Sequence, residues 1–262
     1  MIPLNDPDIR RRTRPYVIYA LVAVNVLIAL YQLTLNGLDQ AVFTYRYGVI
    51  PNELTSGQAF LNLRLPGSPL QDIATPFPTW ATMFSSMFMH GGLMHLGGNM
   101  LFLWVFGDNV EDRFGHFKFL LFYLATGVAA VWAQVFVDPS SQIPMVGASG
   151  AIAGVLGAYL LQFPKSRVDT LIMVGLIMHV RLPALVLIGG WVVMQAFSGL
   201  GSLGVSSAGS GVAYFAHLGG FVAGLAATAL YLAIVRLSGP TGRRRLGPSQ
   251  QRYWRGEPID YD

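Results

Sequence analysis

The chain contains no cysteine and few charged side chains, and each absence excludes some classes of protein. Without cysteine it can form no disulfide framework, thiolate nucleophile or cysteine-ligated metal site. Only 11% of its 262 residues are Asp, Glu, Lys or Arg, whereas about a quarter are charged in an average soluble domain. Apolar residues make up 53% of the chain, and 30 glycines add the small residues that closely packed membrane helices use. This composition predicts a protein embedded in lipid.

The motifs of other membrane-embedded activities are also missing. There is no His-Glu-x-x-His motif, and Asp108 has no second intramembrane aspartate to pair with. The apolar segments offer neither the chain of carboxylates nor the inverted repeat of a transporter. His90 and His95 are five residues apart without an acidic neighbour, so we expect no metal site there, and we expect no cofactor.

Six apolar segments are predicted to be transmembrane helices. The first is about 20 residues long, carries no charge and lacks a clear small-x-small cleavage site, so it is predicted to be a retained anchor rather than a signal peptide. Residues 168–180 are apolar but too short to span, and they are predicted to form a membrane-associated cytoplasmic loop. The predicted spans are residues 16–35, 93–106, 117–137, 149–163, 183–200 and 212–235.

The placement of the basic residues predicts the orientation. Of the 17 Lys and Arg residues, all but Arg46 and Arg64 lie in the two tails or after the second and fourth spans, if Arg236 at the end of the sixth span is counted with the tail. By the positive-inside rule both termini are cytoplasmic, which agrees with an even number of spans. Nucleic-acid binding is the alternative for such arginine runs, but beside apolar helices they more often set topology, so we expect no nucleic-acid partner.

The organisation predicted from these features is an all-α polytopic membrane protein with a six-helix bundle. Residues 1–14 form a cytoplasmic tail, 15–236 the six-span core, and 237–262 a basic cytoplasmic tail that can contact anionic lipid. Residues 36–79 are predicted to be a long outer loop, part of which lies in the membrane interface. Trp80 is a candidate interfacial anchor.

A few polar residues fall within the apolar segments, and such residues are functional candidates because they are costly in lipid. His90, His95 and Asn99 lie at the start of the second span, Ser149 begins the fourth, and His217 lies in the sixth. His95 and Asn99 are four residues apart and therefore share a helix face. Because all these helices begin near the outer side, the candidates are expected at one depth.

Ser149 lies in the motif Gly147-Ala148-Ser149-Gly150 at a loop-to-helix junction. Small neighbours leave its hydroxyl uncovered, and a helix start supplies unpaired N–H groups for an oxyanion. A structural alternative is that these glycines serve only helix packing.

Small residues continue along the faces that carry Ser149 and His217. Ala153 and Gly157 follow Ser149 at helical spacing, and Gly220 and Gly224 follow His217. Two such faces let helix backbones approach closely, which would bring His217 to Ser149 as a general base. No acidic residue lies in the outer half of a span, so we expect a dyad without a carboxylate. His95 and Asn99 would be neutral oxyanion donors. The alternatives are that His217 makes only an interhelical hydrogen bond and that His90 is a structural hydrogen-bonder holding the preceding loop.

The chain resembles the rhomboid intramembrane serine proteases over roughly residues 15–236. His90-x4-His95-x3-Asn99 is similar to the family's motif in the second helix, and Gly147-Ala148-Ser149-Gly150 is similar to its nucleophile motif. Ala216-His217-x-Gly219-Gly220-x3-Gly224 is similar to the family's histidine motif. Glu111-x3-Gly115, with Arg113 inside it, is similar to the family's segment after the second span. The motifs occur in the family's order, which makes the combination specific.

The resemblance implies cleavage of single-span membrane proteins in or beside their transmembrane segment, in a bacterial cytoplasmic membrane. Ser149 would be acylated and His217 would act as base and then acid, while substrates would enter near the fifth span under a lid formed by residues 201–211. Two departures from the family pattern are Ala81 after Trp80, where many members have arginine, and Ala153, where some have an aromatic residue under the histidine. A catalytically silent relative that binds membrane proteins for quality control is the alternative, although such relatives usually lack the serine or the histidine.

Overall fold

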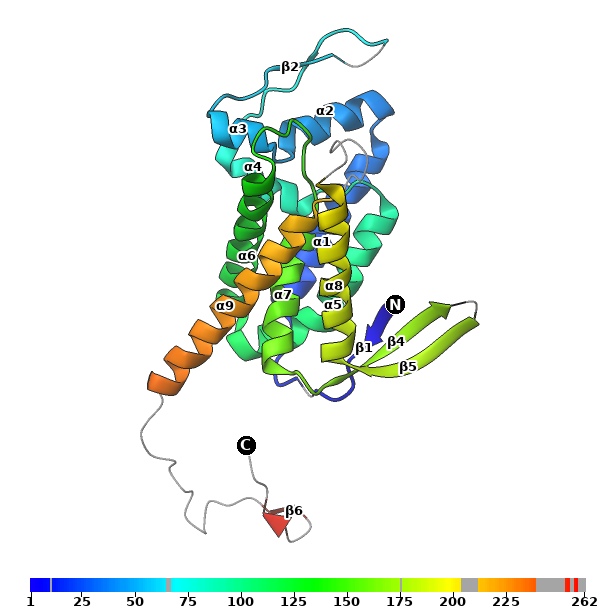
Figure 1. The fold of residues 1–262 in the computed structure, drawn as a ribbon, viewed down its shortest axis with the longest axis vertical. Helices are drawn as coiled ribbons and strands as arrows, with labels where there is room; N and C mark the ends of the chain where they lie inside the picture. The colour runs from blue at the N-terminus through cyan, green and yellow to red at the C-terminus, as the bar shows by residue number, and fades with distance from the viewer. Residues whose placement is uncertain are drawn as a thin grey trace. The chain divides into compact units, whose positions relative to one another are not determined.

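The structure is a computed structural model that describes residues 1–9, 11–64, 67–174, 176–203, 212–238, 253–254 and 257–258 (Figure 1). By its internal contacts the chain divides into Met1–Ala229 and Leu230–Asp262. The helices are α1 (Tyr16–Thr34), α2 (Gly37–Tyr47), α3 (Pro51–Ser56), α4 (Thr82–Ser85), α5 (Leu93–Phe114), α6 (His116–Val137), α7 (Ser149–Gln162), α8 (Ala184–Ser202) and α9 (Tyr214–Ser238), with 3-10 turns η1 (Thr79–Ala81) and η2 (Ser86–Phe88). The strands are β1 (Ile2–Asn5), β2 (Asn62–Leu63), β3 (Gln71–Asp72), β4 (Arg167–Val174), β5 (Leu176–Pro183), β6 (Tyr253–Trp254) and β7 (Glu257–Pro258).

Each of the six predicted spans overlaps a helix. Four of these helices, α1, α6, α8 and α9 as far as Val235, are long and apolar enough to cross a membrane by length and composition. The helix α7 is apolar but shorter, and α5 carries its charged cluster within the helix. The mostly helical structure with four such helices is that of a polytopic membrane protein.

Large apolar side chains cover the outside of these helices. Leu27 on α1 is 65% exposed and Phe197 on α8 is 73% exposed, and further exposed examples are Leu30, Val193, Met194, Leu200, Val222 and Leu230. Apolar patches of this extent mark contact with another molecule or with a membrane. Because these side chains lie on helices long enough to span a membrane, they are suited to contact the hydrocarbon core of a bilayer.

Three segments predicted to be irregular have regular structure. Residues 36–79 contain α2, α3 and the short β2–β3 pair rather than a plain loop. The side chain of Asn36 accepts a hydrogen bond from the Asp39 N–H and starts α2, which is a local capping signal. Residues 168–180, predicted to be a loop, belong to the hairpin of β4 and β5, and residues 2–5 of the predicted tail form β1. The all-α prediction is therefore wrong in this detail.

The strands β1, β4 and β5 form an antiparallel sheet in the order β1-β4-β5. The pairing of β4 with β5 runs from Arg167 opposite Pro183 to Val174 opposite Leu176, while Ile2 of β1 lies opposite Leu171. Figure 1 shows this sheet near the first turn of α8, which begins immediately after β5. The sheet thus joins the first residues of the chain to the connection between α7 and α8.

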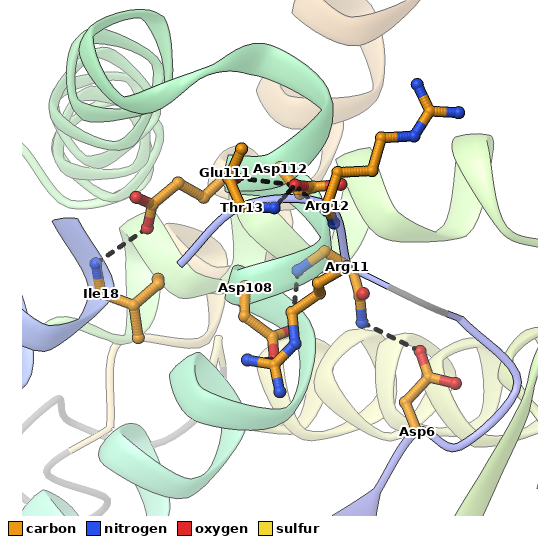
Figure 2. A network of polar contacts seen from close by, with 9 residues as sticks. Asp6, Arg11, Arg12, Thr13, Ile18, Asp108, Glu111 and Asp112 are labelled. Atoms are coloured by element: carbon orange, nitrogen blue, oxygen red, sulfur yellow. Dashed lines mark hydrogen bonds and ion pairs between the residues drawn. The ribbon is translucent and has the colours of Figure 1, made fainter. Parts of the chain in front are cut away.

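The far end of α5 carries a network of carboxylates that hold the residues before and at the start of α1 (Figure 2). Glu111, which is completely buried, accepts hydrogen bonds from the N–H groups of Val17 (3.0 Å) and Ile18 (2.9 Å). These are orphan donors of the first turn of α1, whose own N-cap is a proline without a capping side chain. A carboxylate from a neighbouring helix therefore caps α1.

The other acidic residues of this end are paired as well. Asp112 accepts hydrogen bonds from the backbone and hydroxyl of Thr13, both at 2.7 Å, and Asp108 forms an ion pair with Arg11 at 2.9 Å. Asp6 accepts from Asn109, Tyr159 and Ser166. These pairs explain why α5 continues to Phe114 instead of ending at Phe106 as predicted: the charges within the helix all have partners.

Two predicted features lie wholly or mainly outside the described residues. The predicted lid begins within α8, which runs to Ser202, and residues 204–211 of it are not described. Of the predicted basic tail after residue 236, the structure describes only the end of α9 and the short pair β6–β7.

Candidate active site

Ser149 is the first residue of α7, and the turn that precedes it depends on a glycine with a positive φ. Gly147 has φ +129°, and a Cβ there would lie 2.8 Å from the His95 ring, so a side chain is excluded by both backbone and space. The Gly147 N–H donates to the Ser86 carbonyl (2.9 Å), and Val49 and Met145 exchange two backbone hydrogen bonds just upstream. The loop before the serine is therefore held on both sides.

His217 of α9 lies against this serine. Its Nε2 is 2.7 Å from the Oγ of Ser149, although the two residues are 68 positions apart in the chain. The backbone N–H of Ala216 is held by the side chain of Gln134 on α6 (3.3 Å), which supports the first turn of α9. The pair predicted from the sequence is thus present as a direct hydrogen bond between two helices.

Glycines bring the two helices this close. A Cβ on Gly220 would overlap the carbonyl oxygen of Gly150, and a Cβ on Gly224 would overlap that of Gly154. A Cβ on Gly157 would likewise overlap the carbonyl of Phe221. The close approach was predicted, and Gly157, Gly220 and Gly224 take part in it, but on α7 the adjoining positions are Gly150 and Gly154 rather than Ala153.

His95 and Asn99 lie on one face of α5, and His95 borders the loop that leads to Ser149. The N–H of Gly91 points at Nδ1 of His95 over 3.4 Å, and the ring borders Gly147. With Nδ1 as acceptor, the proton of a neutral ring is on Nε2, where it can be donated. Asn99 is only 7% exposed, and its Nδ2 has no hydrogen-bond partner among the described residues. A buried donor without a partner is costly, which makes it a candidate binding group.

The ring of His90 makes no hydrogen bond to a described residue, whereas one interpretation of the sequence was that it is a structural hydrogen-bonder. Its backbone is held by the side-chain amide of Gln32 on α1, which donates to the His90 carbonyl (3.2 Å) and accepts from its N–H (3.1 Å). The ring packs edge-on against His95, with centroids 5.1 Å apart, and neither ring nitrogen has a partner within the described chain. It supports His95 by packing.

Two residues of α8 complete the surroundings of His217, and neither was singled out from the sequence. The Oε1 of Gln195 is 2.7 Å from Nδ1 of His217, and the Trp191 ring lies 5.8 Å from the imidazole at an angle of 38°. The expected aromatic position, Ala153, is fully buried and small. The ring contact therefore comes from α8. A glutamine within an apolar span was the available signal, because such a residue is costly in lipid.

Two cavities adjoin the site. One of about 40 Å³ is bordered by Ser149, Gly150, Gly127 and Ala130, and is of the order of a water or a small side chain. The other, of about 330 Å³, reaches His95 and is bordered by Gln134, Pro144 and Phe215. Among the described residues no group of three His, Cys, Asp or Glu side chains could hold a metal ion.

The fold and the site define a class: a polytopic membrane protein with a serine and a histidine hydrogen-bonded between two glycine-packed helices. The sequence model of the Rhomboid domain matches residues 78–234, well over half of the chain. The chain belongs to the rhomboid family.

Relatives come from bacteria and from organelles. Over 81 residues, 31% of this chain and 15% of the relative, the sequence is 42% identical to "Rhomboid protease GluP" of Bacillus subtilis. It is 30% identical over 148 residues to "Rhomboid protein 1, mitochondrial" of Saccharomyces cerevisiae, covering 55% of this chain and 40% of that protein. It is 39% identical over 85 residues to "Rhomboid-like protein 11, chloroplastic" of Arabidopsis thaliana, covering 32% and 30%. The matches span less than half the length of these relatives.

Proposed function

We propose that this protein is an intramembrane serine endopeptidase that cleaves transmembrane segments of single-span membrane proteins. The observation that carries this proposal is the 2.7 Å contact between His217 Nε2 and Ser149 Oγ. A histidine within hydrogen-bond reach of a serine is the arrangement of an activated nucleophile. The family includes intramembrane serine proteases, and the name of the Bacillus subtilis relative describes it as a rhomboid protease.

The chemistry proposed for the pair is acyl transfer. Ser149 Oγ attacks the scissile carbonyl carbon while His217 Nε2 takes the hydroxyl proton. When the tetrahedral intermediate collapses, the C–N bond breaks and His217 returns the proton to the leaving amine. Water then attacks the acyl ester and gives a proton to His217, which returns it to Ser149 Oγ as the ester C–O bond breaks and the carboxylic acid leaves.

The oxyanion of each tetrahedral intermediate would be bound by three kinds of donor. The N–H of Ser149 is at a helix start and has no partner within the helix. His95 carries its proton on Nε2 when Nδ1 accepts from Gly91, and Asn99 Nδ2 is a buried donor without a partner in the described structure. Neutral donors aimed at a developing charge in a water-poor site are more effective than in water.

The same proposal includes the topology. Six spans, α1, α5, α6, α7, α8 and α9, would place both termini in the cytoplasm of a bacterial cell, with Ser149 and His217 toward the outer side. The basic residues after α5 and α7 favour this orientation. The division into tails at 1–14 and 237–262 and a core at 15–236 belongs to this proposal, as does lipid contact of the last segment.

The test is cleavage of a model transmembrane substrate by the purified chain in liposomes. We expect wild type to cut and Ser149→Ala to lose roughly a thousandfold or more in rate. Ser140→Ala, an exposed serine in the preceding loop, is the matched control and should cut normally. Equal cutting by Ser149→Ala would show that another residue is the nucleophile. Absence of both cleavage and Ser149 labelling in wild type would favour a silent family member.

A further inference from the structure

The second nitrogen of His217 faces an amide instead of a carboxylate. Nδ1 is 2.7 Å from Oε1 of Gln195, which is only 6% exposed. The ion pairs that histidines form in the described structure involve His116 and His179, and not His217. The partner of this imidazole is therefore neutral, and it lies on a third helix, α8.

This contact selects a ring tautomer. A neutral imidazole carries one proton, on either Nδ1 or Nε2, and only the form with a bare Nε2 can accept the proton of Ser149. An amide oxygen can only accept, so a hydrogen bond to Oε1 of Gln195 requires the proton on Nδ1. The form that Gln195 favours is thus the form that a general base at Nε2 needs.

The ring is also held in its plane from the same helix. Trp191 and Gln195 are four residues apart, so they share one face of α8. The indole lies against the imidazole, with centroids 5.8 Å apart, while the amide meets its edge. One face of α8 thereby restricts both the tilt and the rotation of the His217 ring.

We propose that Gln195 is a positioning residue that turns the Ser149–His217 pair into a triad with a neutral third member. The proposal rests on the proposed function, because a base is needed only if Ser149 is a nucleophile. The residue does not touch the reacting atoms. It acts through His217, by keeping the proton on Nδ1 and Nε2 directed at Ser149.

A purely structural role would have different consequences. If Gln195 only fastened α8 to α9, its replacement would lower thermal stability, and the chemistry would change only as far as the fold loosened. Any residue that cannot form the same interhelical contact would then act alike. The comparison of rate with stability, and of Glu with Met at this position, separates the two roles.

The experiment measures how fast a small fluorophosphonate labels Ser149 in the purified full chain, together with the thermal unfolding midpoint. Gln195→Met keeps the length and removes the acceptor, so labelling should slow about tenfold or more with little change in the midpoint. Gln195→Glu restores an oxygen that accepts from Nδ1 and should recover most of the rate. With a transmembrane substrate, Gln195→Met should lower kcat and leave KM unchanged. Gln162→Met at the other end of α7 is the matched control, because in the described structure the Gln162 amide donates to Ala158 of its own helix.

Two results would overturn the role of Gln195 alone. One is wild-type labelling by Gln195→Met in a protein whose labelling is abolished by His217→Ala. The other is equal slowing by Met and Glu in step with lower unfolding midpoints. If wild type is not labelled, or His217→Ala is labelled normally, the proposed function itself fails and this proposal fails with it.

Discussion

The two ends of α5 handle polar groups in opposite ways. At its far end, the carboxylates of Asp108, Glu111 and Asp112 are each paired with a cation or with backbone and hydroxyl donors. At its beginning, the polar side chains are imidazoles and an amide, without a carboxylate. There, Asn99 Nδ2 and both ring nitrogens of His90 have no partner among the described residues.

The difference separates stability from reactivity. A buried polar group that is fully paired contributes to folding, and removing its partner costs free energy. A buried donor without a partner contributes nothing to folding and is available to a bound substrate. Substitutions at the far end of α5 should therefore change unfolding, whereas those at its beginning should change turnover.

The largest effect that would test this contrast is expected from Glu111→Ala. Loss of the carboxylate leaves the N–H groups of half-buried Val17 and buried Ile18 without this acceptor, so the free energy of unfolding should fall by about 2–3 kcal/mol. Glu111→Gln retains one acceptor and should cost less. Unfolding in detergent measures the change, and cleavage per folded molecule should stay at the wild-type level. A tenfold loss of turnover at unchanged stability would mean that the two ends are coupled.

Asn99→Ala should have the converse effect. Because Nδ2 has no hydrogen bond to lose, the unfolding midpoint should stay the same, while kcat falls roughly tenfold to a hundredfold with KM unchanged. Asn25→Ala is the control, since Asn25 is also buried and, among the described residues, its side chain donates to the Leu21 carbonyl of its own helix α1. Steady-state kinetics on a transmembrane substrate gives both parameters. A raised KM with normal kcat would remove Asn99 from the oxyanion site.

The smallest expected effect is the pH dependence of stability that comes from Asp6, which precedes α1. Burial raises the pKa of its carboxyl, against hydrogen bonds from Tyr159 and Ser166 that lower it. The folded chain therefore holds this proton more tightly than the unfolded chain. The stability from Asp6 is complete below its unfolded pKa and is lost as the pH rises through the folded one.

Asp6→Asn cannot titrate and should remove that dependence. The test is the unfolding midpoint of both proteins in a pH series that starts at roughly pH 4, near the ordinary carboxyl pKa. The difference between wild type and Asp6→Asn should change steadily with pH, in the direction of a wild type that loses its advantage as the pH rises. A constant difference would show that burial does not shift this carboxyl.

Much of the long-helix pattern followed from the sequence because it depends on local composition. Apolar runs bounded by Gly, Pro and charge predicted the helices around Ser149 and His217, and glycine spacing predicted that they approach. The extension of α5 to Phe114 could not be predicted in this way, since it depends on partners such as Arg11 and Thr13 far away in the chain. The β4–β5 hairpin was missed because both of its strands are apolar and were judged only by their length.

The candidate site could be predicted at those positions where the type of residue itself indicates a chemical role. Ser149, His95, Asn99 and His217 are polar groups at the starts of apolar helices or within them. Gln195 is polar too, but the prediction considered only ionisable groups and acids as partners for His217. That Trp191 replaces the aromatic residue missing at Ala153 depends on how α8 faces α9, which no local pattern encodes.

The contact of Gly150 with Gly220 has one further consequence for the distance between serine and histidine. Each glycine is within three residues of its reacting partner, and the two helices meet there through main-chain atoms. The separation of the two helix backbones beside Ser149 and His217 is thus set by main-chain atoms and not by side-chain rotamers, which change on fast timescales. A methyl group added at either glycine would push the helices apart by a distance comparable to the range over which a hydrogen bond can form. Side-chain motion elsewhere in the helices can therefore leave the distance between the two backbones unchanged.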